Sequence, residues 1–369
     1  MRMLLAIGLL GLASFTPPTD RAEIGTAVYV GEDILYEYDP EPALVRDVTD
    51  VPAARFAAVD VHCHWQLQSD PSDLLAAMDR RNVAYAVNLS GGTGLNLRKM
   101  LARFDDPRLI TFMNIDYDGL DDPDWPAKTE QAIRENHAAG ARGIKIWKNL
   151  GLTLKDDAGN VVRVDDPRLD AIWRTAGELG IPILIHVADP AAFFQPTDAK
   201  NERWMQLTRR PSWSFYGDEF PSREEVLAQR DNVLAKFPDT MFIGAHVANE
   251  SEDLKSVAER LRKHPNLYAD ISGRVGELGR QPYSARKFLL EFQDRILFGT
   301  DRYPGRPDQP RYAIYYRFLE TDDEYFKPYD HPFPPSGDWE IHGVFLPDDV
   351  LEKIYWSNAA KLLKLEPLD

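Results

Sequence analysis

The stretch VDVHCH at residues 59–64 places two histidines on either side of a cysteine. Successive side chains of a β-strand point to opposite faces, so His62 and His64 would share one face and Cys63 the other. The same alternation predicts that Asp60 points into the interior with the histidines, and that the two valines face outward with Cys63. Two imidazoles at this spacing, at the end of a strand, form a clamp for a divalent ion such as zinc.

Three further potential ligands each follow directly on a short apolar run. His186 follows Ile-Leu-Ile, His246 follows Ile-Gly-Ala, and Asp301 follows Phe-Gly-Thr. A single histidine in such a place is typical of a satisfied core residue. Four histidines and an aspartate, all at the ends of strands, instead predict a functional site that can hold a metal ion.

The elements that must position these residues follow a regular alternation from residue 58 onward. The predicted strands are Ala58–Trp65, Val83–Leu89, Leu109–Asp116, Arg142–Lys148, Ile181–Val187, Met241–Val247, Leu267–Ser272 and Ile296–Asp301. Helical patterns lie between them, and a last one covers Pro347–Leu363. Eight strands alternating with helices predict an α/β fold, a (β/α)₈ TIM barrel. The alternative is an open doubly wound sheet, which would need a Gly-rich phosphate loop that is missing after the first strand.

Two segments are longer than ordinary loops, residues 190–222 after the fifth strand and residues 302–346 after the eighth. Both follow the C-terminal ends of strands, the face where barrel active sites lie. We therefore expect these insertions to wall a substrate pocket.

Composition and the N-terminal residues predict the kinds of partner and the location of the protein. The net charge of −16 disfavours nucleic acid and anionic membranes as partners. A basic residue, an apolar run at 4–13 and two prolines at 17–18 predict a signal peptide over residues 1–20 and an exported protein, although a buried first helix is the alternative. No segment is long enough to span a bilayer. The predicted domains are this signal peptide, an N-terminal extension at 21–57 and a barrel at 58–365.

Residues 58–365 resemble the amidohydrolase superfamily, most closely its amidohydrolase-related (family 2) branch. That branch includes non-oxidative decarboxylases similar to aminocarboxymuconate semialdehyde decarboxylase, and some lactone hydrolases. The motifs that carry the resemblance are Val59–His64, Gly143–Lys145, Ile185–His186, Ala245–His246, Gly299–Asp301 and Tyr355–Ala360.

The resemblance implies a site for one divalent ion, with zinc as the expected metal, held by His62, His64, His186 and Asp301. His246 would stand beside a metal-bound water, hydrogen-bonding or deprotonating it. Three neutral imidazoles and one carboxylate leave a net charge of +1, which lowers the pKa of such a water toward ~7. Asp301 is expected to take the proton and pass it to the leaving group, so His246 and Asp301 are the predicted catalytic residues.

Strand alternation turns Lys145 inward, because Ile144 and Ile146 must face the apolar layer. Relatives with two metals bridge them with a carboxylated lysine on this strand, so a carboxylated Lys145 would allow a second ion. We favour an uncarboxylated lysine that balances the charge of Asp301 or binds a substrate carboxylate. Trp65, Arg274 and Arg302 are further predicted substrate-binding residues, each near the end of a strand.

The sequence thus favours a metal-dependent hydrolase that cleaves an amide, ester or lactone of a small carboxylated or sugar-derived substrate. A decarboxylase of an aromatic or unsaturated acid is the alternative. A non-catalytic metal-binding protein is a third reading, which His246 disfavours because storage needs no general base. Barrels of this type often form homodimers, although no feature of this sequence requires one.

Overall fold

The structure, a computed structural model, describes residues 42–302, 311–329 and 336–368. The signal peptide predicted over residues 1–20 lies outside these residues, so it and the predicted export stay predictions. Among the described residues, no helix is both long and apolar enough to cross a membrane.

All strand pairs of the described residues are parallel. The strands are β1 (Ala58–Cys63), β2 (Val83–Asn88), β3 (Leu109–Thr111), β4 (Met113–Asn114), β5 (Ile144–Ile146), β6 (Ile183–Ile185), β7 (Phe242–Gly244), β8 (Leu267–Asp270) and β9 (Ile296–Leu297). Hydrogen bonds order them as β1-β2-β3 and as β4-β5-β6-β7-β8-β9. This is the strand succession expected for the predicted barrel.

Backbone hydrogen bonds outside the named strands join the two sheets into a ring. Only Phe112 separates β3 from β4, and its N–H donates to the carbonyl of Asn88 on β2 at 2.9 Å. On the other side, the N–H of Asp301 donates to the carbonyl of His62 at 2.8 Å, so the chain after β9 runs beside β1. The predicted TIM-barrel fold is confirmed.

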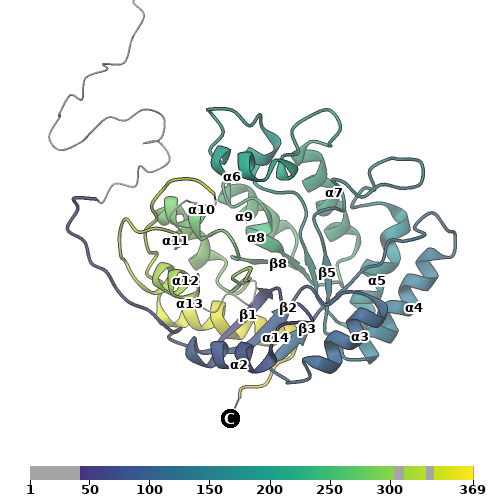
Figure 1. Cartoon of the computed structure of the whole chain (residues 1–369), viewed down its shortest axis with the longest axis horizontal. Coiled ribbons are helices and arrows are strands. Elements are labelled where there is room, and N and C mark those ends of the chain that lie inside the picture. Colours follow the sequence, from purple (N-terminus) through teal and green to yellow (C-terminus); the bar gives the residue numbers. More distant parts are fainter. Residues whose placement is uncertain (1–41, 303–310, 330–335, 369) are drawn as a thin grey trace, which may run out of the picture. The chain divides into compact units, whose positions relative to one another are not determined.

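Helices surround the strands on the outside (Figure 1). They are α2 (Pro71–Arg80), α3 (Gly94–Arg103), α4 (Trp125–Ala138), α5 (Asp170–Leu179), α7 (Arg223–Lys236), α9 (Leu254–Lys263), α10 (Val275–Arg280) and α11 (Pro282–Glu291). The chain ends in α13 (Asp348–Glu352), the π-helical turn η4 (Lys353–Ser357) and α14 (Asn358–Leu363). Helix starts follow local capping chemistry: the Ser222 side chain accepts from the N–H of Glu225 at the start of α7.

Alternate residues of the strands fill the barrel interior. In β1 the residues that face inward are not all the ones that were predicted. Val59 and Val61 pack in the interior with Leu184 and Leu297, rather than facing outward. Asp60 was predicted to point inward; instead it points outward, where it accepts a hydrogen bond from Tyr312 at 2.8 Å. The reason is a β-bulge: three residues of β1 after Asp60 span only two of β2, which breaks the alternation. Beyond the bulge, Cys63 packs outward as predicted.

The two insertions carry their own short helices. The first contains η2 (Ala191–Phe194), α6 (Trp204–Arg209) and η3 (Pro211–Trp213). The second contains α12 (Arg311–Glu320), a helix that the sequence analysis did not predict. Its Tyr312 and Tyr316 rings stack on Phe298, with ring centres 6.2 and 5.6 Å away. The second insertion therefore packs directly behind the segment that leads from β9 to Asp301.

Candidate metal centre

The structure brings three of the four predicted metal ligands together. Oδ1 of Asp301 lies 3.2 Å from Nε2 of His64 and 3.7 Å from Nε2 of His62. The potential ligand atoms of these three residues all lie within 4.8 Å of one another, and both histidines are buried. They come from the adjacent C-terminal ends of β1 and β9, which the parallel register places side by side. Two imidazoles and one carboxylate are donors that suit a divalent ion of the zinc type.

Hydrogen bonds at the far side of each imidazole hold Nε2 toward the site. Nδ1 of His62 lies 2.9 Å from Oδ2 of Asp270, and Nδ1 of His64 lies 2.9 Å from Oγ of Ser90. A proton on Nδ1 satisfies a carboxylate and leaves Nε2 as the metal-binding atom. Burial lowers the pKa of His64 to about 4, so its ring is neutral and ready to bind at neutral pH.

Asp301 adopts a left-handed backbone conformation with φ of 55°. The guanidinium of Arg311 donates to its carbonyl oxygen at 2.6 Å and fixes this conformation. Burial alone would raise the pKa of the Asp301 carboxyl, but the hydrogen bond with His64 and the nearby charge of Arg311 lower it below its usual range. The residue is therefore a carboxylate at neutral pH, as a metal ligand must be.

The fourth predicted ligand, His186, lies outside this group. Its Nε2 is 3.3 Å from Oδ1 of Asp189, whose other oxygen accepts from the ammonium of Lys148 at 2.6 Å. Burial lowers the pKa of His186 to about 4, so the ring is neutral. Its ring centre lies 4.6 Å from that of His246, at the same mouth of the barrel. The role of His186 as a ligand stays a prediction.

His246 is not at the end of a strand but in a short turn directly after β7. Its φ of 59° and ψ of 49° are left-handed, which carries its ring to within 4.7 Å of the His62 ring, centre to centre. Nδ1 lies 2.7 Å from the carbonyl oxygen of Ser272, so Nδ1 carries the proton and Nε2 does not. Burial, followed by the charge of Arg274, holds the pKa of His246 well below its usual value. This imidazole is a neutral acceptor of protons.

Lys145 is a buried cation of the site. It is 1% exposed, and its Nζ has no hydrogen-bond partner among the described residues. The ammonium lies 5.2 Å from the ring centre of Trp147, which in turn lies 5.3 Å from the ring of His64. Burial lowers the pKa of Lys145 to about 8, against the opposing charges of Asp270 and Asp301. The inward position predicted from the sequence is confirmed, and Trp147 forms a wall beside it.

The other predicted substrate-binding residues divide into two groups. Arg274 is buried near His246 and donates to Oδ1 of Asn249 at 3.3 Å, while its Nε has no partner among the described residues. Trp65 and Arg302 are not brought to the histidines. They line a small cavity of about 20 Å³ with Cys63 and Tyr312, on the outer side of β1.

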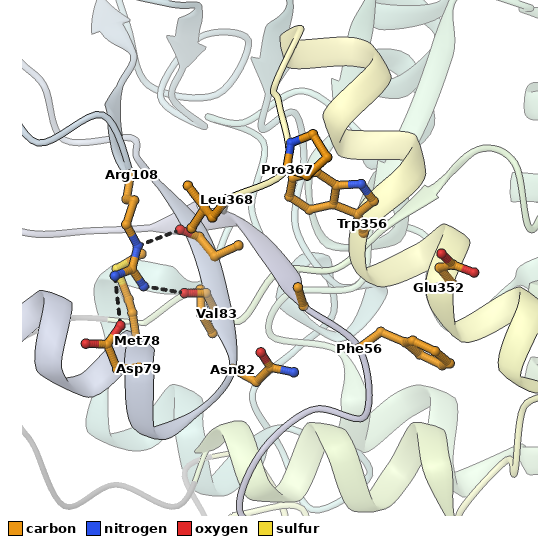
Figure 2. A pocket seen from close by; sticks show the side chains of 12 residues that line it. Phe56, Met78, Asp79, Asn82, Val83, Arg108, Glu352, Trp356, Pro367 and Leu368 are labelled. Carbon is orange, nitrogen blue, oxygen red and sulfur yellow. Dashed lines mark hydrogen bonds and ion pairs between the residues drawn. The ribbon is translucent and has the colours of Figure 1, made fainter.

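A larger cavity of about 510 Å³ lies at the opposite end of the barrel. Figure 2 shows its lining, which comes from the residues before β1, the start of β2 and the C-terminal segment. The Arg108 guanidinium there donates to the carbonyls of Val83 and Ala84 and to Asp79. Because Arg108 is paired within the protein and the histidines are at the other end of the strands, this cavity is not part of the metal centre.

Sequence reasoning missed the residues that hold the histidines in place. Asp270, Ser272 and Ser90 contact imidazole nitrogens, and Asp189 contacts His186. The sequence did contain a signal for Asp270 and Ser272. They lie two positions apart at the end of a predicted strand, as His62 and His64 do.

Comparison with protein-family models matches residues 53–365 to the family described as amidohydrolase. The chain belongs to the amidohydrolase family. A comparison with curated proteins gave no match. The membership and the ligand group together make this amidohydrolase a metal-dependent enzyme.

Solved structures share the fold of this amidohydrolase at low identity. One is the 2,6-dihydroxybenzoate decarboxylase from Rhizobium, 15% identical with a TM-score of 0.52, covering 84% of this chain and 99% of that chain. Another is a dihydroxybenzoic acid decarboxylase from a Polaromonas species, solved with manganese and the inhibitor 2-nitroresorcinol. It is 13% identical with a TM-score of 0.52, covering 84% of this chain and 97% of that chain. These likenesses show a shared barrel fold.

Proposed function

We propose that this amidohydrolase is a hydrolase that cleaves an amide, ester or lactone bond in a small carboxylated substrate. The observation that carries the proposal is His246, a buried neutral imidazole whose Nδ1 is held by the Ser272 carbonyl and whose Nε2 carries no proton. Such a group accepts a proton from an attacking water at neutral pH.

The donor set of His62, His64 and Asp301 fits one divalent ion, for which we propose zinc, with His186 as the fourth ligand. When bound, such an ion supplies Lewis acidity that eases ionisation of water and polarises a carbonyl. The rest of the reaction belongs to the protein's own side chains. Because Asp301 belongs to the ligand group and Nε2 of His246 carries no proton, we assign the proton to His246 rather than to Asp301.

The proposed sequence of bonds is simple. The oxygen of a water molecule adds to the carbonyl carbon while Nε2 of His246 takes a proton from that water. The bond from carbon to the amide nitrogen or ester oxygen then breaks, and His246 returns the proton to that leaving atom. Lys145 holds a carboxylate of the substrate, which would supply the partner that its buried ammonium lacks among the described residues.

Decarboxylation of an aromatic acid is the second candidate. Trp147 stands beside both His64 and Lys145 and offers an aromatic face to a planar acid. Two solved structures with the same fold are dihydroxybenzoate decarboxylases. In that reaction the bond from the ring to the carboxylate would break and a proton would take its place.

A substrate panel separates the two. Carboxylated lactones, amides and esters, together with hydroxybenzoic acids, would be incubated with the metal-loaded enzyme and with its His246→Asn variant. Hydrolysis gives products that contain an added water, whereas decarboxylation releases CO₂. Turnover of phenolic acids with CO₂ release and without any hydrolysis would reject the hydrolase in favour of the second candidate.

A further inference from the structure

Asp270, the last residue of β8, touches both histidines that the chemistry needs. It is fully buried, and its Oδ2 lies 2.9 Å from Nδ1 of His62. Its Oδ1 accepts from the backbone N–H of His246 at 3.0 Å, from the N–H of Ser272 at 3.0 Å and from the hydroxyl of Ser272 at 2.5 Å. One carboxylate therefore joins a metal ligand to the proton acceptor.

The backbone that carries His246 needs such an anchor. Residues 246–249 all have φ between 53° and 59°, a run of left-handed conformation in non-glycine residues. This conformation costs free energy at each such residue, most of all at the β-branched Val247, so it persists only where the surroundings fix it. The bond from the His246 N–H to Asp270 holds the start of the turn, and Arg223 donates to the carbonyl of Asn249 at 2.6 Å at its end.

Ser272 completes the network between the two rings. Its Oγ lies 2.8 Å from Nδ1 of His62 and 3.0 Å from Nδ1 of His246. Because its only hydroxyl hydrogen is donated to Asp270, the oxygen can only accept from the imidazoles. Both rings must therefore carry their proton on Nδ1, which leaves both Nε2 atoms bare.

We propose that Asp270 is a positioning residue that, together with the Ser272 hydroxyl it holds, fixes the same tautomer and facing orientation in His62 and His246. It contacts no substrate; it acts through the two imidazoles and through the left-handed turn. The inference rests on the proposed function in one respect: there, Nε2 of His62 binds the metal and Nε2 of His246 takes the proton. A purely structural role would leave the tautomers and the metal affinity unchanged once the protein is folded.

The variant Asp270→Asn tests the proposal with almost no change of shape. The amide oxygen of asparagine can still accept from the N–H groups of His246 and Ser272. Its NH₂ group would then face Nδ1 of His62, where two donors cannot pair, so His62 must move its proton to Nε2. A metal-binding atom is lost, and affinity for an added ion should fall roughly 10–100-fold, the range seen for partners of ligating histidines.

Two measurements report this directly. Titration of the metal-free proteins with Co²⁺ gives the dissociation constant and the visible spectrum of the bound ion. Nitrogen-15 NMR of histidine-labelled, metal-free protein gives the tautomer of each ring. The matched control is Asp323→Asn, which alters another buried carboxylate that accepts from Thr49 and Arg317, away from the histidines. The control should bind Co²⁺ as the wild type does.

The proposal predicts Nδ1–H tautomers for His62 and His246 in the wild type, an Nε2–H tautomer for His62 in Asp270→Asn, and weaker Co²⁺ binding by that variant alone. Unchanged Co²⁺ affinity and an unchanged His62 tautomer in the folded variant would overturn it. If the variant does not fold, the nitrogen-15 NMR spectrum of the wild type still tests the proposal, because an Nε2–H tautomer at His62 would contradict it. A wild type that binds no Co²⁺ but shows the predicted tautomers would reject the proposed function and leave the role of Asp270 supported.

Discussion

Replacing Lys145 with methionine should make the protein more stable while it removes substrate binding. The ammonium is buried without a hydrogen-bond partner among the described residues, and burial lowers its pKa from 10.5 to about 8. Each pKa unit corresponds to about 1.4 kcal/mol, so keeping this charge in the folded protein at pH 7 costs about 3 kcal/mol. Methionine has a similar length and no charge. The free energy of unfolding of Lys145→Met should therefore rise by up to about 3 kcal/mol at pH 7.

The pH dependence gives the sharper test, by urea unfolding of both proteins between pH 7 and pH 10.5. The unfolded chain holds the lysine proton up to about pH 10.4, whereas the folded protein releases it near pH 8. Wild-type stability should therefore rise relative to the variant across this interval until the difference disappears. Lys148→Met is the control, because Lys148 pairs with Asp189 and its loss should not stabilise the protein. The reasoning would be refuted if Lys145→Met were no more stable than wild type at pH 7. It would also be refuted if the difference in free energy of unfolding between the two proteins did not change with pH.

Three further predictions concern the histidines. His246→Asn should lower kcat roughly 10²–10⁴-fold and keep the bound metal; a variant that loses the metal would show that His246 is a ligand instead. His186→Ala should weaken zinc affinity by at least about 10-fold, and an unchanged dissociation constant would remove His186 from the ligand set. His64 should contribute about 3 kcal/mol to the stability that the metal-free protein loses between pH 6.5 and pH 4, because unfolded His64 binds its proton near pH 6.5 and folded His64 only near pH 4. Measured by urea unfolding, His64→Gln should lose about 3 kcal/mol less than the wild type over this interval, while His186 and His246 still contribute their own losses.

The fold and the first ligands could be predicted because they depend on local patterns. The strands of a parallel barrel are buried on both faces, so they appear in the sequence as apolar runs. The polar residue that ends each run must lie at the mouth of the barrel. His64 and Asp301 are far apart in the sequence, yet parallel strands bring their ends together. Lys145 follows the same logic, since isoleucines on both sides leave it only the interior.

The remaining features depend on tertiary contacts that no local pattern encodes. The bulge after Asp60 turns that carboxylate outward to Tyr312, and strict alternation could not foresee it. The left-handed turn at His246 requires the anchor of Asp270, 24 residues later. Trp65 was predicted at the site because it ends a strand, but its ring packs against Phe104 in the outer layer. Side-chain direction past the last paired residue of a strand is set by the loop and not by the pleat.

The most direct test of a metal centre at the mouth of this barrel is anomalous diffraction from crystals of the zinc-loaded protein, collected on both sides of the zinc absorption edge. The structure predicts one anomalous peak per chain, within bonding distance of Nε2 of His62, Nε2 of His64 and a carboxylate oxygen of Asp301. A zinc peak elsewhere in the chain, or none among these three residues, would contradict it. Two peaks at the mouth, bridged by a carboxylated Lys145, would keep the centre and replace the single ion with a pair.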